Sequence, residues 1–210
     1  MKHDSGQREA CKRFIIDAAR RVFDEKGVEN TNMDDIASAA NYTRRTLYAY
    51  FKSRDEISLS IFIEDLITRW EEQKKKLAEA GTGLEKIIKW AESLYSFTLR
   101  HPHSIHLQLY WDLKGIDRDR ISEEIFASFE KINDELAEGL REIFGLGVKD
   151  GSLRPDLKID ITISQFLYSF RNILNRAISS TYSFAYFDPD EYVASYLDLF
   201  KRGIQNPGGN

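Results

Sequence analysis

Apolar residues recur at helical spacing along nearly the whole chain, and this spacing most limits what the sequence can fold into. No segment shows the strict alternation of apolar and polar residues that marks a half-buried strand. Glycine, proline and asparagine fall between the periodic segments, where they end or begin helices. The sequence therefore predicts an all-α protein of about nine helices, at residues 8–26, 32–40, 43–51, 54–79, 84–100, 103–114, 119–145, 159–181 and 189–203.

Residues 31–54 carry the most specific pattern, two short helices separated by a tight turn. Thr31 is suited to cap the first helix, and Asp34 three residues later can complete a capping box. Asn41 follows the last apolar residue of that helix, and asparagine tolerates the left-handed conformation in which helices commonly end. Thr43 can cap the second helix, so the segment predicts a helix-turn-helix.

The second of these helices has an inward face and an outward face. Leu47 and Phe51, four residues apart, are expected to anchor it. Arginine can bond guanine edges or phosphates, threonine offers a hydroxyl and a methyl group, and alanine permits close approach to a groove. The outward face therefore suits a probe of the DNA major groove, although a solvated helical hairpin is the alternative. Its side chains are Arg44, Arg45, Thr46, Tyr48 and Ala49.

The stretch GVENTNMDDIASAANYTRRTLYAYFKSRDEI resembles the DNA-binding signature of the TetR family of bacterial transcriptional repressors. It departs from that family at Asn41, where glycine is usual. The resemblance implies contacts with bases and nearby backbone from Thr43, Arg44, Arg45, Thr46, Tyr48 and Ala49. It implies phosphate contacts from Tyr50, Lys52 and Arg54. Thr31 is either a further phosphate contact or only a helix cap.

Charge is distributed unevenly along the chain. Residues 1–54 contain eleven Lys or Arg against eight Asp or Glu, whereas residues 55–210 contain nineteen against twenty-six. A basic head is drawn to phosphates, and an acidic body is kept away from them. Together with the layout that the resemblance implies, this predicts a helix-turn-helix DNA-binding domain at 1–54 and a larger helical effector-binding and dimerisation domain at 55–210.

The last two predicted helices have wide apolar stripes. Such stripes fit a core and a subunit interface equally well. The resemblance favours an interface, because the family typically dimerises through its last two long helices. We therefore expect a homodimer through about 159–181 and 189–203, and a near-palindromic site on double-stranded DNA.

Twenty of the 26 aromatic residues lie after residue 54, on helices expected to surround a common interior. An apolar or aromatic small-molecule effector fits such an interior best. A plain aromatic core without a cavity is the alternative for each residue. The candidate effector-binding residues are Trp90, Tyr95, His106, Tyr110, Trp111, Phe129, Phe166 and Phe170.

Three histidines, His101, His103 and His106, fall within six residues and raise the possibility of a metal site. Proline interrupts the run, and no Cys, Asp or Glu lies inside it to complete a tetrahedral set. We therefore expect a solvated or pocket-lining role for the histidines, with no metal and no other cofactor.

Other classes of protein lack support in the sequence. There is no phosphate-binding glycine loop, nucleophile elbow or HExxH pair, so no enzymatic activity is expected. No apolar run reaches the length of a membrane span, and the polar start does not read as a signal peptide, so we expect a cytoplasmic protein. Cys11 is the single cysteine, which excludes an internal disulfide, and its place on an apolar stripe suggests a buried structural thiol.

These observations and the resemblance together predict a homodimeric, effector-responsive DNA-binding regulator, a repressor that a small ligand releases from its operator. The alternatives are a helical small-molecule-binding module and a transcriptional activator.

Overall fold

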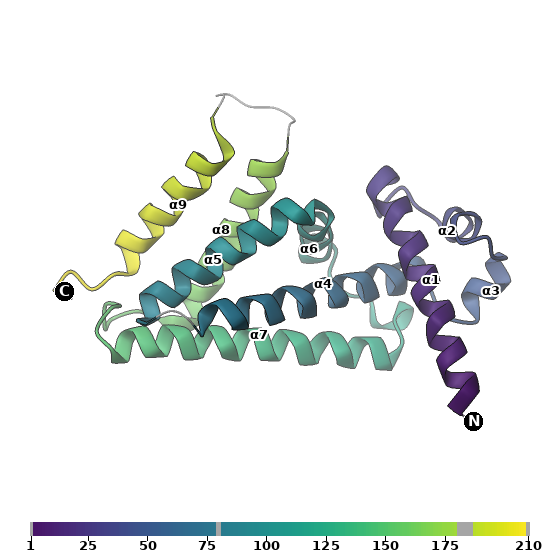
Figure 1. Ribbon diagram of the computed structural model, residues 1–210, viewed down its shortest axis with the longest axis horizontal. Coiled ribbons are helices and arrows are strands. Elements are labelled where there is room, and N and C mark those ends of the chain that lie inside the picture. The colour runs from purple at the N-terminus through teal and green to yellow at the C-terminus, as the bar shows by residue number, and fades with distance from the viewer. Residues whose placement is uncertain (1, 79–80, 180–186, 209–210) are drawn as a thin grey trace. The chain divides into compact units, whose positions relative to one another are not determined.

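The computed structural model describes residues 2–78, 81–179 and 187–208, and its regular elements there are helices (Figure 1). The predicted all-α class is confirmed. Positions 79, 180 and 181, which the sequence places in helices, lie outside the described residues. The elements are α1 (Lys2–Lys26), α2 (Met33–Ala39), α3 (Arg44–Tyr48), α4 (Arg54–Leu77), α5 (Gly83–Arg100), α6 (Pro102–Lys114), the 3-10 turn η1 (Arg118–Arg120), α7 (Glu123–Lys149), α8 (Ile159–Ile178) and α9 (Pro189–Ile204).

The chain divides into two compact units. The first comprises residues up to Leu66 together with Leu107–Ile132, and the second comprises Ile67–His106 together with residues from Asn133 onward. The division does not fall at residue 54, because α4, α6 and α7 each contribute to both units. The domain boundary that the sequence suggests after Arg54 stays a prediction. The described helices include no candidate for crossing a membrane.

The first unit is built around α1–α3, in which α1 packs on α2 and α2 packs on α3. Ile15, Ile36 and Leu47, one from each helix, are completely buried. Burial of each such side chain contributes about 1.5–3 kcal/mol. The apolar stripe predicted on α1 is only partly buried, because Phe14 is exposed and Cys11 is of intermediate exposure.

The start of α2 differs from the prediction. Asn32 is the N-cap, since its side chain accepts hydrogen bonds from the backbone N–H groups of Asp34 and Asp35. The Asp35 carboxylate accepts one from the N–H of Asn32 at 2.9 Å and completes the capping box. The predicted Thr31–Asp34 box is therefore wrong by one residue. The Thr31 hydroxyl donates instead to the carbonyl oxygen of Gly27 at 2.8 Å.

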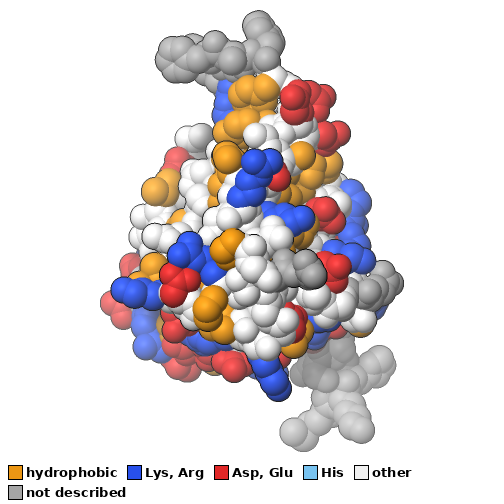
Figure 2. Space-filling view, turned by 90° about the vertical axis from the view of Figure 1, so that its left-hand side faces the viewer, with side chains coloured by type: hydrophobic (Ala, Val, Ile, Leu, Met, Phe, Trp, Pro, Cys, Tyr) orange, Lys and Arg blue, Asp and Glu red, His pale blue; other side chains and the backbone are white. Residues whose placement is uncertain are grey.

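The second unit has an aromatic interior. Helices α8 and α9 pack against each other, and α5 packs against both. Trp90, Phe166 and Phe170 are buried, and the ring of Phe166 lies 5.9 Å from that of Trp90 and 5.3 Å from that of Phe170. Figure 2 views the side on which α9 lies, where hydrophobic side chains reach the surface among charged ones.

The predicted helix 119–145 is wrong at both ends. Residues Arg118–Arg120 form η1, and α7 continues through Gly145 and Gly147 to Lys149. A Cβ atom on Gly83 would lie 2.2 Å from the backbone nitrogen of Gly147, so these glycines permit close approach of α5 and α7. The helix ends at Lys149, and the turn that follows contains Gly151, which has a φ of +80°.

Candidate nucleic-acid interface

The turn and cap that precede α3 form as the sequence predicts. Asn41 has a φ of 52°, the left-handed conformation that ends α2. The side chain of Thr43 caps α3 by accepting a hydrogen bond from the N–H of Thr46 at 3.1 Å. Leu47 and Phe51 are buried as predicted and fix the helix on the first unit.

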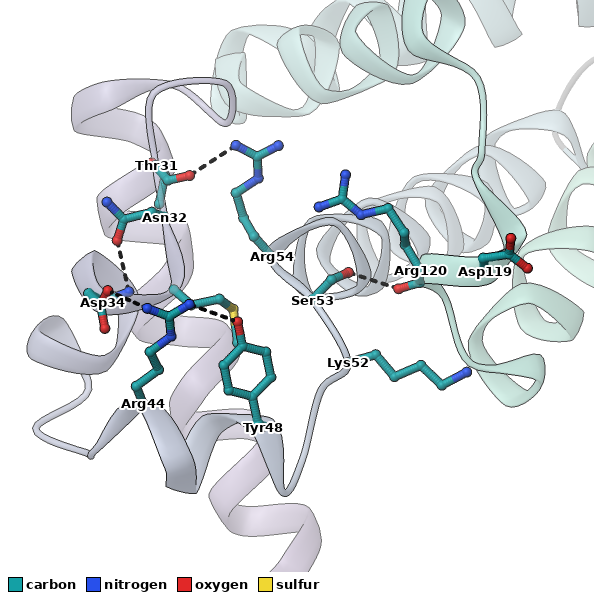
Figure 3. Close-up of a pocket in the computed structure, with 11 residues that line it drawn as sticks. Thr31, Asn32, Asp34, Arg44, Tyr48, Lys52, Ser53, Arg54, Asp119 and Arg120 are labelled. Carbon is teal, nitrogen blue, oxygen red and sulfur yellow. Dashed lines mark hydrogen bonds and ion pairs between the residues drawn. The ribbon is translucent and has the colours of Figure 1, made fainter.

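Arg44 stands on the outward face of α3, between two side chains that orient it. Its guanidinium donates to Asp34 of α2 at 3.0 Å and to the hydroxyl of Tyr48 at 3.4 Å (Figure 3). The hydrogen bond to Tyr48 and the charge of Asp34 raise the pKa of Arg44. The side chain remains 57% exposed, so water weakens both contacts. Arg44 is therefore held in one orientation, and its guanidinium is still accessible to a partner from solvent.

The other outward residues of α3 and its C-cap also reach the solvent. Arg45, Tyr48 and Ala49 are exposed, and Thr46 is of intermediate exposure. Among the described residues, no side-chain hydrogen bond or ion pair holds Arg45. The residues that the sequence assigns to base contacts thus share one exposed ridge whose opposite side is anchored in the core.

Arg8 of α1 contacts the segment that follows α3, and the sequence did not single it out. Its guanidinium donates to the carbonyl oxygen of Ala49 at 3.1 Å, beyond the end of α3, and lies over the ring of Tyr50 at 5.1 Å. A groove beside this contact is also lined by Lys12 and Lys52. Two basic residues four apart at the start of a helix, Arg8 and Lys12, were the available signal.

A second group of charges lies at the start of α4, within the same unit. Asp55 is 3% exposed and pairs with Arg54 at 2.9 Å, Lys114 at 2.9 Å and Arg120 at 3.2 Å. The hydroxyl of Tyr110 donates to the same carboxylate at 3.3 Å. We call these five residues the Asp55 cluster. Burial acts to raise the pKa of Asp55, but the hydrogen bonds from Lys114 and Arg54 outweigh it and lower that pKa.

Hydrogen bonds that involve the backbone also connect the start of α4 to η1 and the start of α7. The hydroxyl of Ser53 donates to the carbonyl oxygen of Arg120 at 2.8 Å, and the N–H of Ser122 donates to Glu56 at 2.8 Å. Glu56 also accepts a bond from the N–H of Lys52. The chain leaving α3 is thereby joined to η1 and the start of α7. No local sequence signal announces these contacts, since the partners are more than 60 residues apart.

Two of the predicted phosphate contacts are engaged inside the unit. Arg54 donates to the carbonyl oxygens of Glu29 at 3.1 Å and Thr31 at 2.9 Å, and its side chain is only 20% exposed. Thr31 itself is buried. Lys52, by contrast, is exposed, and its ammonium donates to the carbonyl oxygen of Ile121 at 3.3 Å.

The predicted effector residues fall in both units. Trp90, Tyr95, His106, Phe166 and Phe170 belong to the second, and Tyr110, Trp111 and Phe129 belong to the first. Trp90, Phe166 and Phe170 come together in one interior. Tyr95 instead donates to Asp190 at 2.6 Å, and burial together with this bond raises the pKa of Tyr95 to about 12. The hydroxyl of Tyr110 belongs to the Asp55 cluster, where it also accepts a bond from Lys114.

The histidines do not assemble into a site that the structure supports. The rings of His101 and His103 lie 5.9 Å apart, edge to face, and His106 is exposed. Across the described ranges, no three His, Cys, Asp or Glu side chains are grouped as metal ligands.

Comparison with known proteins agrees with the geometry of α1–α4. Residues 15–61 match the sequence model of the bacterial regulatory proteins of the tetR family. The chain is 25% identical over 162 residues to the HTH-type transcriptional repressor KstR2 of Rhodococcus jostii (strain RHA1), covering 75% of each chain.

Solved structures share the fold. The transcriptional regulator FadR from Bacillus subtilis, solved in complex with stearoyl-CoA, superposes with a TM-score of 0.70 at 21% identity, over 92% of this chain and 99% of that one. The ketosteroid transcriptional regulator KstR2 of Mycobacterium tuberculosis gives a TM-score of 0.65 at 17% identity, over 92% and 94%. The family match of residues 15–61 covers the helices that carry the exposed ridge of α3, and it identifies this part of the chain as a DNA-binding segment of the TetR type.

Proposed function

We propose that the protein binds a near-palindromic DNA operator as a homodimer and acts as a repressor that a small ligand releases. The observation that carries this proposal is the outward face of α3, where Arg44 and Arg45 are exposed while Leu47 anchors the helix behind them. A short helix fixed on one side and cationic on the other can enter a major groove without unfolding anything. Such a regulator acts where its DNA lies, so the proposed location is the cytoplasm.

The proposed contacts divide into two kinds. Arg44 and Arg45 reach base edges, where a bidentate bond to guanine gives sequence preference. Lys52 and Tyr50 meet phosphates, which position the protein without reading sequence. Thr43, Thr46, Tyr48 and Ala49 complete the ridge. For Arg54 and Thr31 we propose an internal role, because their polar groups already bond within the unit.

The proposed dimer interface is the outer face of α8 and α9. The inner stripes of these helices are occupied, since Phe166, Phe170 and Leu197 are buried within the chain. Apolar side chains nevertheless remain exposed on both helices, namely Tyr168 and Leu199. A twofold contact through this face would cover them and present two copies of α3 to one duplex.

The proposed effector is apolar and binds within the second unit. Oε1 of Gln73 and Nε1 of Trp90 are among the buried polar atoms there that have no hydrogen-bond partner in the described residues. Buried polar atoms are nearly always paired in proteins, so these two suit the polar end of a ligand. Relatives named for ketosteroid and fatty acid regulation support an apolar ligand class. The ligand would favour a dimer geometry that fits the operator poorly.

Selection of bound duplexes from a random pool tests the DNA-binding part of the proposal. The purified protein should enrich a sequence with dyad symmetry, because two copies of α3 read it in opposite directions. The matched control replaces both Arg44 and Arg45 by alanine, which leaves Leu47 and the fold in place and should abolish enrichment. No enrichment by the unaltered protein would refute the proposal.

Addition of candidate ligands tests the effector part. Stearoyl-CoA and a ketosteroid are the first probes, since the related structures name them. A ligand of the proposed class should raise the thermal midpoint and release the selected duplex, and Gln73→Leu should weaken both effects. A ligand that stabilises the protein without changing duplex affinity would contradict the coupling.

A further inference from the structure

A basic pocket lies beside the exposed ridge of α3, entirely within the first unit. It has a volume of about 470 Å³ and is walled by three segments: the start of α2, the outward side of α3 with the 52–54 segment, and η1 (Figure 3). Arg44 and Tyr48 of the ridge line one wall, and Arg120 of η1 lines another. The pocket is therefore continuous with the proposed base-reading surface.

The charges that line this pocket do not balance. Four cationic side chains, Arg44, Lys52, Arg54 and Arg120, face two acidic ones, Asp34 and Asp119. Arg44 is paired with Asp34, and the Lys52 ammonium donates to the backbone carbonyl of Ile121. A concave surface with excess positive charge concentrates anions.

Arg120 shares its acidic partner, Asp55, with two other cationic side chains. Its guanidinium lies 3.2 Å from the Asp55 carboxylate, but Arg54 and Lys114 already pair with the same group at 2.9 Å each. Three cations thus share one buried anion. The side chain of Arg120 is 50% exposed, whereas that of Arg54 is 20% exposed. Arg120 is the member of the Asp55 cluster with the most freedom to bind an anion from solvent.

The backbone of η1 holds Arg120 at the edge of the pocket. The hydroxyl of Ser53 donates to the carbonyl oxygen of Arg120, Ile121 is buried, and the N–H of Ser122 is bonded to Glu56. Figure 3 shows Arg54 and Arg120 extending on the same side of Ser53. A guanidinium on a fixed backbone loses less entropy on binding than one on a free loop.

We propose that this pocket binds a phosphate group and that Arg120, although it lies outside the N-terminal three helices, is one of its cationic ligands together with Lys52. The inference rests on the proposed DNA-binding function. The phosphate comes either from the backbone of the operator or from a free phosphorylated compound. In the first case the DNA-binding surface extends to the turn between α6 and α7.

Operator binding at several salt concentrations tests the first source. Each phosphate contact contributes about 0.9 to the slope of log affinity against log salt concentration. Arg120→Ala should therefore flatten the slope by about 1. The matched control is Arg118→Ala, on the same turn, whose guanidinium lies over the ring of Phe126 at 4.0 Å and does not line the pocket. Arg118→Ala and Arg120→Lys should keep the slope of the unaltered protein.

A thermal melt with inorganic phosphate and no DNA tests the second source. A phosphate-dependent rise in the melting temperature that Arg120→Ala removes and Arg118→Ala keeps would assign the pocket to a free anion. Arg120→Ala that changes neither the salt slope nor this rise overturns the inference. So does Arg120→Ala that lowers the melting temperature and the affinity at an unchanged slope, since that describes a purely structural residue. Binding of the operator by the unaltered protein keeps the proposed function standing in both cases.

Discussion

Arg44 and Arg54 each begin a helix and stand ten residues apart, but their surroundings differ. Arg44 is 57% exposed and shares one ion pair with an exposed carboxylate, whereas Arg54 is 20% exposed and bonds two carbonyl oxygens and a buried carboxylate. Water screens an exposed pair and leaves it weak, so Arg44 can leave Asp34 for DNA at little cost. Arg54 cannot leave without breaking its bonds to two carbonyl oxygens and its ion pair with the buried carboxylate of Asp55. Whether an arginine of this unit can bind DNA therefore depends on how many buried groups of the protein it already bonds.

Replacing the aspartate that pairs with each arginine should give the largest difference in the free energy of unfolding. Asp55→Ala leaves Arg54, Lys114 and Arg120 without their shared carboxylate, and loss of one partner of a buried pair costs about 3–5 kcal/mol. We expect the lower end of that range, because Arg120 can turn to water. Urea unfolding measures the change.

The control for this experiment is Asp34→Ala, which removes the exposed partner of Arg44. It should change the free energy of unfolding by less than about 0.5 kcal/mol. Similar losses from the two variants would remove the distinction between the two regions.

Replacing Arg44 should weaken operator binding and leave the stability of the fold unchanged. Arg44→Ala should cost about 1–3 kcal/mol of operator affinity and relax the preference for the natural sequence over a scrambled one. The free energy of unfolding should stay within about 0.5 kcal/mol of the unaltered protein. Fluorescence anisotropy on both duplexes measures the affinities, and Arg141→Ala, in the second unit, is the control. An Arg44→Ala protein that loses stability and keeps affinity would reverse the assignment.

The exposed ridge of α3 could be foreseen because its causes are local. The Thr43 cap, the left-handed Asn41 and the Leu47–Phe51 anchor all depend on residues within a few positions of each other. The α2 cap shows the limit of local reasoning. Thr31 and Asn32 are both good caps, and each has an aspartate three residues later, but Asn32 caps α2 while the Thr31 hydroxyl bonds to Gly27.

The Asp55 cluster could not be foreseen, because its partners are brought together by tertiary structure. Asp55 and Lys114 are 59 positions apart, and nothing near either residue indicates the other. The same limit explains Tyr110, which composition assigned to an effector pocket and which contacts Asp55 instead. A glycine in the sequence can mark either a helix end or a close contact between helices, and only tertiary structure distinguishes the two. Gly147 packs closely against Gly83, although the sequence suggests a helix end there.

Exposed apolar side chains can be compared in the same way, according to whether they lie on the proposed dimer interface. Leu199 on α9 is 68% exposed and lies on the proposed interface, whereas Leu99 on α5 is 52% exposed and does not. Leu199→Glu should weaken self-association about tenfold or more, since burying an unpaired charge costs well over 1.4 kcal/mol. Leu99→Glu should leave it unchanged. Sedimentation equilibrium measures both, and equal effects would exclude this face as the interface.

Changing the charge of Asp55 while keeping its shape gives the smallest expected effect. The pKa of Asp55 is lowered from 3.8 in the folded protein, because the bonds from Lys114 and Arg54 outweigh burial. A lowered folded pKa means that the carboxylate stabilises the fold above its unfolded pKa and that this stability is lost as pH falls through the folded value. The free energy of unfolding of the unaltered protein should therefore decline more steeply than that of Asp55→Asn as pH falls from about 5 to 2. Because other carboxylates titrate equally in both proteins, parallel curves would mean that Asp55 holds the junction by hydrogen bonding alone, and that its charge contributes nothing to the contrast with Arg44.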